Sequence, residues 1–255
     1  MKIATWNVNS LKVRIEQVLH WLQSSQCDIL CLQETKLTDE HFPAQQIQAA
    51  GYHVAYSGQK TYNGVAIIAK QPITQVQTDI PGLDDPQRRI MCASVGNLRV
   101  LDLYVVNGKA VDTDKYHYKL NWLEKVTAYI QQQMQQHEHL LVLGDFNIAP
   151  EDRDVHNPLS WRDKILCSQP ERAALQGILD LGLSDLFRQF EQPDNSFSWW
   201  DYRSGGFEKN QGLRIDLILG TSALRQHCTA CSIDTTPRTW ERPSDHAPVL
   251  AAFSL

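Results

Sequence analysis

The sequence predicts an α/β fold in which two packed β-sheets carry helices on their outer faces. Strand patterns and helical patterns alternate along all 255 residues, and the strand patterns outnumber the helical ones. Many strands with fewer interleaved helices are typical of packed sheets that are covered by helices. Because no long stretch rich in proline, glycine and serine interrupts the pattern, residues 1–255 are expected to form a single domain.

The first half of the chain contains four strand patterns and one amphipathic helix. Residues 2–8 alternate apolar and polar side chains, which predicts a strand. Residues 11–24 place apolar side chains at helical spacing and therefore predict a helix. Short apolar runs at 28–32 and 65–69 predict buried strands. Residues 99–106 are rich in β-branched and aromatic side chains, which favours a further strand.

The second half contains two helix patterns and further strands. Residues 115–136 predict a long helix, and residues 171–181 predict a shorter one. A buried strand is expected at 140–143, and further strands are expected at 196–200, 215–219 and 249–253. The segment from Pro150 to Ser168 is the least regular part of the chain. We expect it to form a long surface loop, and such loops often carry function.

The net charge limits the kinds of nucleic-acid binding that the chain supports. A formal charge of −5 argues mildly against a passive nucleic-acid binder, which usually has a basic surface. An enzyme whose carboxylates bind a cation is compatible with this charge, provided that local basic clusters hold the phosphates. Either DNA contacts or ordinary solvated charges would explain Arg88-Arg89, Lys115 with Lys119, and Arg203 with Lys209 and Arg214.

Cysteine usage and hydropathy favour a cytoplasmic protein. Six scattered cysteines are expected to be free thiols in a reducing compartment. Cys228 and Cys231 have the spacing of a zinc-ligand pair, but no second pair stands out. No apolar run approaches the length of roughly 18 residues that a membrane helix needs. The first residues also lack the features of a signal peptide.

Polar side chains collect where the apolar strands end. They are Asn7, Glu34, Asp145, Asn147, Asp216, Asp245 and His246. A single carboxylate at such a place more often caps a turn. Five strand ends with these groups are harder to explain in that way, because aligned strand ends converge on one edge of a layered sheet. Oxygen ligands with one imidazole and no thiolate favour a hard cation such as Mg²⁺ or Mn²⁺.

Asp216 is the sharpest local anomaly, because it interrupts an apolar strand. An unpaired buried charge is costly, so Asp216 needs a partner. His246 is the partner that we expect, since a carboxylate that orients an imidazole is the arrangement of a catalytic pair. A structural ion pair with Arg214 is the alternative.

Short motifs extend from Trp6 to Pro248. They are Trp6–Ser10 (WNVNS), Leu32–Lys36 (LQETK), Gly58–Lys60 (GQK), Asn63–Ala66 (NGVA), Asp85–Ile90 (DPQRRI), Asn107–Gly108 (NG), Gly144–Pro150 (GDFNIAP), Phe197–Trp199 (FSW), Leu213–Asp216 (LRID) and Pro243–Pro248 (PSDHAP). In this order they resemble the exonuclease III family of DNA-repair nucleases, within the endonuclease/exonuclease/phosphatase superfamily. Each motif is weak alone, and their joint order is specific.

The resemblance implies a fold and a metal site. The fold is a four-layered α/β sandwich of two mostly antiparallel mixed sheets with outer helices. Glu34 is implied as the main ligand of Mg²⁺, for which Mn²⁺ can substitute, with help from Asn7 and Asp245. The metal-binding set also includes Asp145, Asn147 and His246.

The resemblance also implies catalytic roles. Asp145 and Asn147 position the attacking water and stabilise developing charge, and His246, oriented by Asp216, lies at the scissile phosphate. Whether Asp145 or His246 accepts the proton of the water stays open. Tyr104 and Asn107 match positions near the phosphate.

Contacts with the substrate are implied for five further residues. Arg88, Lys119 and Arg203 are expected to touch the DNA backbone. Trp199 and Leu213 match positions at the pocket for a sugar that lacks its base, although Trp199 could instead be a core aromatic. Double-stranded DNA with abasic sites, nicks or 3′ ends is therefore the expected partner of a monomeric enzyme.

The implied function is metal-dependent hydrolysis of DNA phosphodiesters in base-excision repair. It combines 3′–5′ exonuclease activity, 3′-end phosphodiesterase and phosphatase activity, and abasic-site incision of uncertain strength. Leu166 stands where the family lines its sugar pocket, and a bulky group there would hinder a flipped abasic sugar yet spare a 3′ end. A phosphatase for a non-DNA phosphoester and a non-catalytic nucleic-acid-binding regulator are the alternatives.

Overall fold

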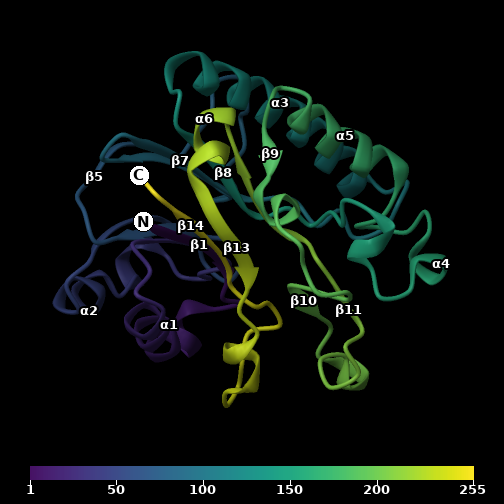
Figure 1. Cartoon of the computed structure of the whole chain (residues 1–255), viewed down its shortest axis with the longest axis horizontal. Coiled ribbons are helices and arrows are strands. Elements are labelled where there is room, and N and C mark those ends of the chain that lie inside the picture. The colour runs from purple at the N-terminus through teal and green to yellow at the C-terminus, as the bar shows by residue number, and fades with distance from the viewer.

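The computed structural model describes residues 1–255, apart from the side chain of Ser204. Within the described residues, two six-stranded mixed sheets stack face to face between two layers of helices (Figure 1). Sheet A has the order β13-β14-β1-β2-β4-β3, and sheet B has the order β5-β6-β7-β8-β12-β9. β1 pairs with β2 in parallel, as β7 does with β8, and the other pairs are antiparallel.

The strands of the two large sheets are short. Sheet A contains β1 (Lys2–Asn7), β2 (Ile29–Gln33), β3 (His53–Ser57), β4 (Val65–Ala69), β13 (Cys228–Ile233) and β14 (Val249–Phe253). Sheet B contains β5 (Ile73–Gln77), β6 (Ile90–Val95), β7 (Leu98–Tyr104), β8 (Leu140–Asp145), β9 (Ser184–Asp185) and β12 (Asp216–Gly220). A small separate ribbon pairs β10 (Trp199–Trp200) with β11 (Gly212–Leu213).

Helices cover the outer faces of both sheets and complete the four layers. α1 (Leu11–Ser25) and α2 (Ala44–Ala49) pack on sheet A, and α3 (Asp114–Gln136) and α5 (Gln169–Leu179) pack on sheet B. The shorter helices are α4 (Pro158–Trp161), α6 (Ser222–His227) and the 3₁₀ turns η1 (Asp39–His41), η2 (Asp152–Asp154), η3 (Leu186–Gln189), η4 (Arg203–Gly205) and η5 (Thr236–Thr239). A third apolar core fills the space between the sheets. The predicted α/β sandwich is confirmed.

The central strand β1 of sheet A places polar groups inside the molecule. In β1 every residue after Lys2 is buried, including Thr5 and Asn7, although residues 2–8 alternate like a strand with one wet face. A strand in the middle of a sheet that is covered on both sides has no solvent face. The polar members of the pattern therefore point into the space between the sheets, where Asn7 reaches Asp145 of β8.

Some elements differ from the sequence-based expectation. The expected strand 196–200 shortens to β10, which lies outside both large sheets. The segment from Pro150 to Ser168 is more than a surface loop, because Asp154, Leu166 and Cys167 are buried in it. All six cysteines are free and buried. Among the described residues, no helix combines the length and apolar character needed to cross a bilayer.

Candidate active site

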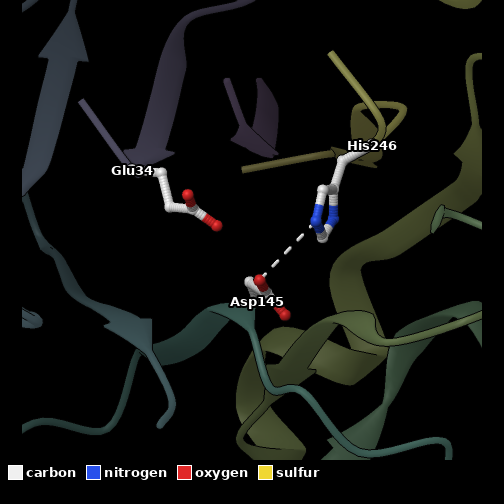
Figure 2. A group of neighbouring side chains, drawn as sticks. All are labelled: Glu34, Asp145 and His246. Atoms are coloured by element: carbon white, nitrogen blue, oxygen red, sulfur yellow. Dashed lines mark ion pairs between the residues drawn. The ribbon is translucent and has the colours of Figure 1, made fainter. Parts of the chain in front are cut away.

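Three titratable side chains from different strand ends converge at one edge of the two sheets. Glu34 follows β2, Asp145 ends β8, and His246 lies just before β14. One potential ligand atom from each lies within 4.8 Å of the other two. Figure 2 shows the three side chains facing a common centre, with Nε2 of His246 3.8 Å from Oδ2 of Asp145. This cluster is the point at which the packed layers bring distant motifs together.

Asn7 holds the two carboxylates of the cluster close to each other. Its Nδ2 donates to Oε1 of Glu34 and to Oδ2 of Asp145, each at 2.9 Å. Its Oδ1 accepts from the backbone N–H of Asn9. Two carboxylates at this separation repel each other unless donors or a cation compensate them. Asn7 supplies part of that compensation and, in this arrangement, its amide oxygen faces Asn9.

A lysine supplies positive charge beside the same carboxylates. Nζ of Lys36 lies 2.9 Å from Oε2 of Glu34 and 2.5 Å from Oδ1 of Asn9. Burial would raise the pKa of Glu34, but the charge of Lys36 and hydrogen bonds from Lys36 and Asn7 lower it below its ordinary value. Glu34 is therefore an anion that already attracts a cation. The oxygen-rich surroundings suit Mg²⁺ or Mn²⁺.

Asp216 and His246 form the contact that the sequence analysis expects. Nδ1 of His246 lies 2.9 Å from Oδ2 of Asp216, and both side chains are buried. The hydroxyl of Ser198 also donates to Oδ2 of Asp216, at 2.7 Å. The alternative, an ion pair between Asp216 and Arg214, is wrong, because Arg214 forms ion pairs with Asp154 and Asp185.

The surrounding charges and burial raise the pKa values of His246 and Asp145 to different extents. Burial lowers the pKa of His246, but the charges of Asp216 and Asp145 outweigh burial and raise it above the ordinary value. Burial raises the pKa of Asp145 to about 7, although the charge of His246 works in the opposite direction. At neutral pH the imidazole is therefore protonated, and Asp145 is partly protonated.

Two asparagines and a tyrosine border the cluster. The Nδ2 group of Asn107 donates to Oδ1 of Asn147 at 3.0 Å, and Nδ2 of Asn147 donates to the carbonyl of Val105. The backbone N–H of Asn147 donates to Oδ1 of Asp145. Burial raises the pKa of Tyr104 well above its ordinary value, so its hydroxyl stays protonated close to Glu34. These contacts fix the side chains against the carboxylates.

Asp245 lies one step away from the cluster. Its Oδ1 accepts from Nδ2 of Asn9, and its Oδ2 accepts from Nε1 of Trp199 at 3.0 Å. Asp245 is therefore joined to the expected metal centre through Asn9. Asn9 and Lys36 were not predicted as site residues, although they lie within the motifs Trp6–Ser10 and Leu32–Lys36.

A polar pocket adjoins Glu34, and its basic residues are not the ones that were expected to contact DNA. It has a volume of about 460 Å³, and its walls include Glu34, Lys36, Tyr62, Arg89, Tyr104 and Lys115. Arg89, which lies over the ring of Tyr104 at 4.6 Å, lines this pocket. Arg88 lies outside it and approaches Asp79 at 3.5 Å.

Two of the residues expected to contact DNA differ sharply in exposure and are both paired with carboxylates. Arg203 is 89% exposed and pairs with Asp201 near the β10–β11 ribbon. Lys119 is completely buried and forms an ion pair with Glu171, so the expectation that it touches the DNA backbone is wrong. The reason is its position on α3, where it lies within the buried stripe of the helix.

An apolar cluster forms the other side of the site. Leu166 and Leu213 are buried in it together with Val155, and Trp199 packs against it. Trp199 also pairs with His246 through an isolated bridge. Leu166 has a φ of +72°, a backbone conformation that bulky residues rarely adopt. Leu213 is covered by its neighbours here, and Trp199 is only partly buried.

Comparisons with known proteins give consistent matches over the whole chain. A model of the Endonuclease/Exonuclease/phosphatase family matches residues 4–246. Exodeoxyribonuclease III of Haemophilus influenzae is 36% identical across 99% of this chain and 100% of its own length. The 3′ phosphatase NExo from Neisseria, solved with a product DNA hairpin, has a TM-score of 0.98 and 46% identity, with full coverage of both chains. An AP endonuclease from Archaeoglobus fulgidus has a TM-score of 0.96 and 37% identity, also with full coverage.

Proposed function

Because the chain belongs to the exonuclease III and AP endonuclease family of hydrolases, we propose that it is a metal-dependent phosphodiesterase and phosphatase acting on 3′ ends of double-stranded DNA. The observation that carries this proposal is the convergence of Glu34, Asp145 and His246 beside a pocket with basic walls. The product DNA hairpin bound to the Neisseria relative supports a DNA substrate. We further propose that residues 1–255 act as one catalytic domain and as a monomer in the cytoplasm.

Glu34 is the residue best suited to hold Mg²⁺. Its carboxylate stays ionised, and it already faces the ammonium of Lys36. Asp145 adds a second carboxylate, with an oxygen within 4.8 Å of one of Glu34. A bound Mg²⁺ supplies charge compensation for the phosphate and for the leaving oxygen. A protonated His246 offers its Nε2–H to a phosphate, because Nδ1 is paired with Asp216 and an imidazolium has no free lone pair for a metal.

Asp145 is the residue that we assign as acceptor of the water proton. A group with a pKa of about 7 can take a proton at neutral pH and release it afterwards. His246 is held in its charged form by Asp216 and is a poor base at this pH. Asn147, which donates its backbone N–H to Asp145, helps to orient that carboxylate. Tyr104, kept protonated by burial, is a fixed donor for developing negative charge.

The apolar cluster favours 3′-end chemistry over incision at abasic sites. A duplex with an internal abasic site must insert a flipped sugar into a pocket before its phosphate reaches the metal. Leu166 and Leu213 fill the space beside Trp199 in this structure. We propose that a recessed 3′ end reaches the centre without displacing them, so that 3′-phosphate removal is strong and abasic-site incision is weaker.

A two-substrate cleavage assay tests this function. One duplex carries a 3′-phosphate at a recessed end and the other an abasic-site analogue, each with Mg²⁺ and with EDTA. We expect cleavage that EDTA abolishes and that Glu34→Ala lowers by roughly 10²-fold or more. Glu124→Ala, which removes an exposed carboxylate on α3, is the matched control. Cleavage of neither duplex under any metal would contradict the proposal and favour a non-DNA phosphatase or a non-catalytic binding protein.

A further inference from the structure

Lys119 is a charged side chain with no exposure to solvent. Both it and its partner Glu171 have side chains that are 0% exposed, and the two charged atoms lie 2.5 Å apart. Ionic pairs at such depth often contribute little to stability compared with apolar residues of similar volume. The other partners of the pair therefore indicate its role better than the ion pair does.

The ammonium of Lys119 binds the backbone of two active-site asparagines. Nζ donates to the carbonyl oxygen of Asn147 at 2.7 Å and to that of Asn107 at 3.3 Å. With Glu171 as the third acceptor, all three N–H groups of the ammonium are used. Asn147 has a φ of +49°, an uncommon conformation that an anchored carbonyl helps to hold.

Glu171 binds the turn that carries Leu166. Its Oε1 accepts from the backbone N–H of Leu166 at 3.1 Å, and its Oε2 accepts from the N–H and hydroxyl of Ser168. The hydroxyl of Tyr116, one turn before Lys119 on α3, also lies 2.7 Å from that of Ser168. The carboxylate of Glu171 thus links the turn at Leu166 to the ammonium of Lys119, which binds the carbonyls of the two asparagines.

Tight packing around Gly108 shows how close these segments lie. Gly108 has a φ of +87°, and a Cβ there would come within 2.9 Å of Cδ1 of Ile165 and 3.2 Å of Cδ of Lys119. Such distances are shorter than ordinary contacts between carbon atoms. The turn after Asn107 and the turn before Leu166 therefore meet across the stem of Lys119.

From these contacts, and resting on the proposed function, we infer that the Lys119–Glu171 pair is a positioning device for Asn107 and Asn147. The pair fixes the backbone of both asparagines and, through the same carboxylate, the turn that borders the sugar pocket. It acts on the reaction through these residues without touching the substrate. A displacement of about 1 Å in a positioning group can cost roughly 10²-fold in rate.

The test compares a double variant in two backgrounds. Lys119→Met with Glu171→Gln removes both buried charges and keeps an acceptor for the turn. We expect kcat for 3′-phosphate removal to fall roughly 10²-fold, with KM little changed. In the Asn147→Ala background the same double variant should cost little more, because groups that act through one another are not additive. Equal losses in both backgrounds would overturn the inference.

A structural control and a second readout complete the experiment. Leu123→Ala opens the core beneath the same helix, so it lowers Tm without touching the asparagines. It should leave kcat unchanged at temperatures where the protein is folded. In ¹⁵N-asparagine-labelled protein, the signals of Asn107 and Asn147 should move in the double variant and stay in place in Leu123→Ala. This readout needs no activity, and unmoved signals would overturn the inference even if the proposed function failed.

Discussion

The two sides of the active site differ in what they offer to a substrate. The polar pocket presents the charges of Lys36, Arg89 and Lys115 to solvent, where phosphate oxygens can replace water. Leu166 and Leu213 in the apolar cluster are buried, and the Lys119–Glu171 pair binds the turn that carries Leu166. If the proposed function holds, this difference predicts a division of labour in which the polar pocket would bind any DNA backbone and the apolar cluster would select substrates by shape.

The largest expected effect lies between the two sides, at Asp216. Asp216→Asn would weaken the orientation of His246 and its positive charge, because Oδ2 of Asp216 is the acceptor beside Nδ1. We expect kcat to fall roughly 10²–10⁴-fold on both substrates alike, measured as single-turnover rates. Asp185→Asn, which alters an ion pair of buried Arg214, is the matched control and should retain activity. A loss confined to one substrate would show that His246 serves only one side.

A smaller effect, specific to one substrate, is expected at Leu166. Glycine suits the φ of +72° without strain, so Leu166→Gly should fold and should also open the apolar cluster. We expect the rate of abasic-site incision relative to 3′-phosphate removal to rise roughly 10-fold. Leu159→Gly, at a 78% exposed position of the same segment, should leave the ratio unchanged. An unchanged ratio in Leu166→Gly would rule out the steric explanation.

The polar side can be weakened by a third variant. Arg89→Gln removes one cation from the pocket, so KM should rise for both substrates by the same factor. The slope of log binding constant against log salt concentration should also fall by about 1 in magnitude. Arg88→Gln is the neighbouring control, because Arg88 points toward Asp79 outside the pocket. If the two variants weaken binding equally, the pocket is not where the backbone binds.

The smallest expected effect is at Asp102, which neither side of the site uses. Burial raises its pKa well above the ordinary value, and a hydrogen bond from Gln33 only partly opposes this. The folded protein thus holds a proton that the unfolded chain releases above about pH 3.9. The contribution of this proton to the free energy of unfolding is complete at low pH. It declines by about 1.4 kcal/mol per pH unit as the pH rises from the unfolded pKa toward the folded pKa.

Asp102→Asn should remove that decline, since an amide does not titrate. Thermal unfolding should show a larger gain in Tm at pH 8 than at pH 5, with catalytic rates unchanged. A gain that is the same at both pH values would mean that Asp102 is ionised in the folded protein.

The sequence predicted the parts of the site that depend on strand ends. Glu34, Asp145 and His246 stand out because a polar residue at the end of an apolar strand interrupts a simple pattern. Lys119 was misinterpreted, although a signal was present: it lies three residues after Tyr116 and four before Leu123, within the buried stripe of α3. A basic residue inside an apolar stripe indicates a buried pair, and the sequence alone does not identify its partner 52 residues away.

Burial and side-chain direction account for the other differences. Adjacent arginines at 88 and 89 look alike in sequence, and only the path of the chain into β6 turns Arg89 toward Tyr104. Strand β5 was missed because most of its residues are exposed and polar, as is common at the edge of a sheet. Most of the central strands were predicted, because burial on both faces leaves an apolar signal that needs no partner to be recognised. The buried strand β6 was not predicted.

The pairing of β1 with β14 has a consequence for how the enzyme matures. Residues 2–5 hydrogen-bond to residues 249–252, and Trp6 reaches the carbonyl of His246 across a separation of 240 residues. Contacts between such distant segments slow folding, because a large loop must close before they contribute. During synthesis, Glu34 therefore emerges long before the imidazole that faces it. We therefore expect the growing chain to have an incomplete active site and no nuclease activity until β14 enters the sheet.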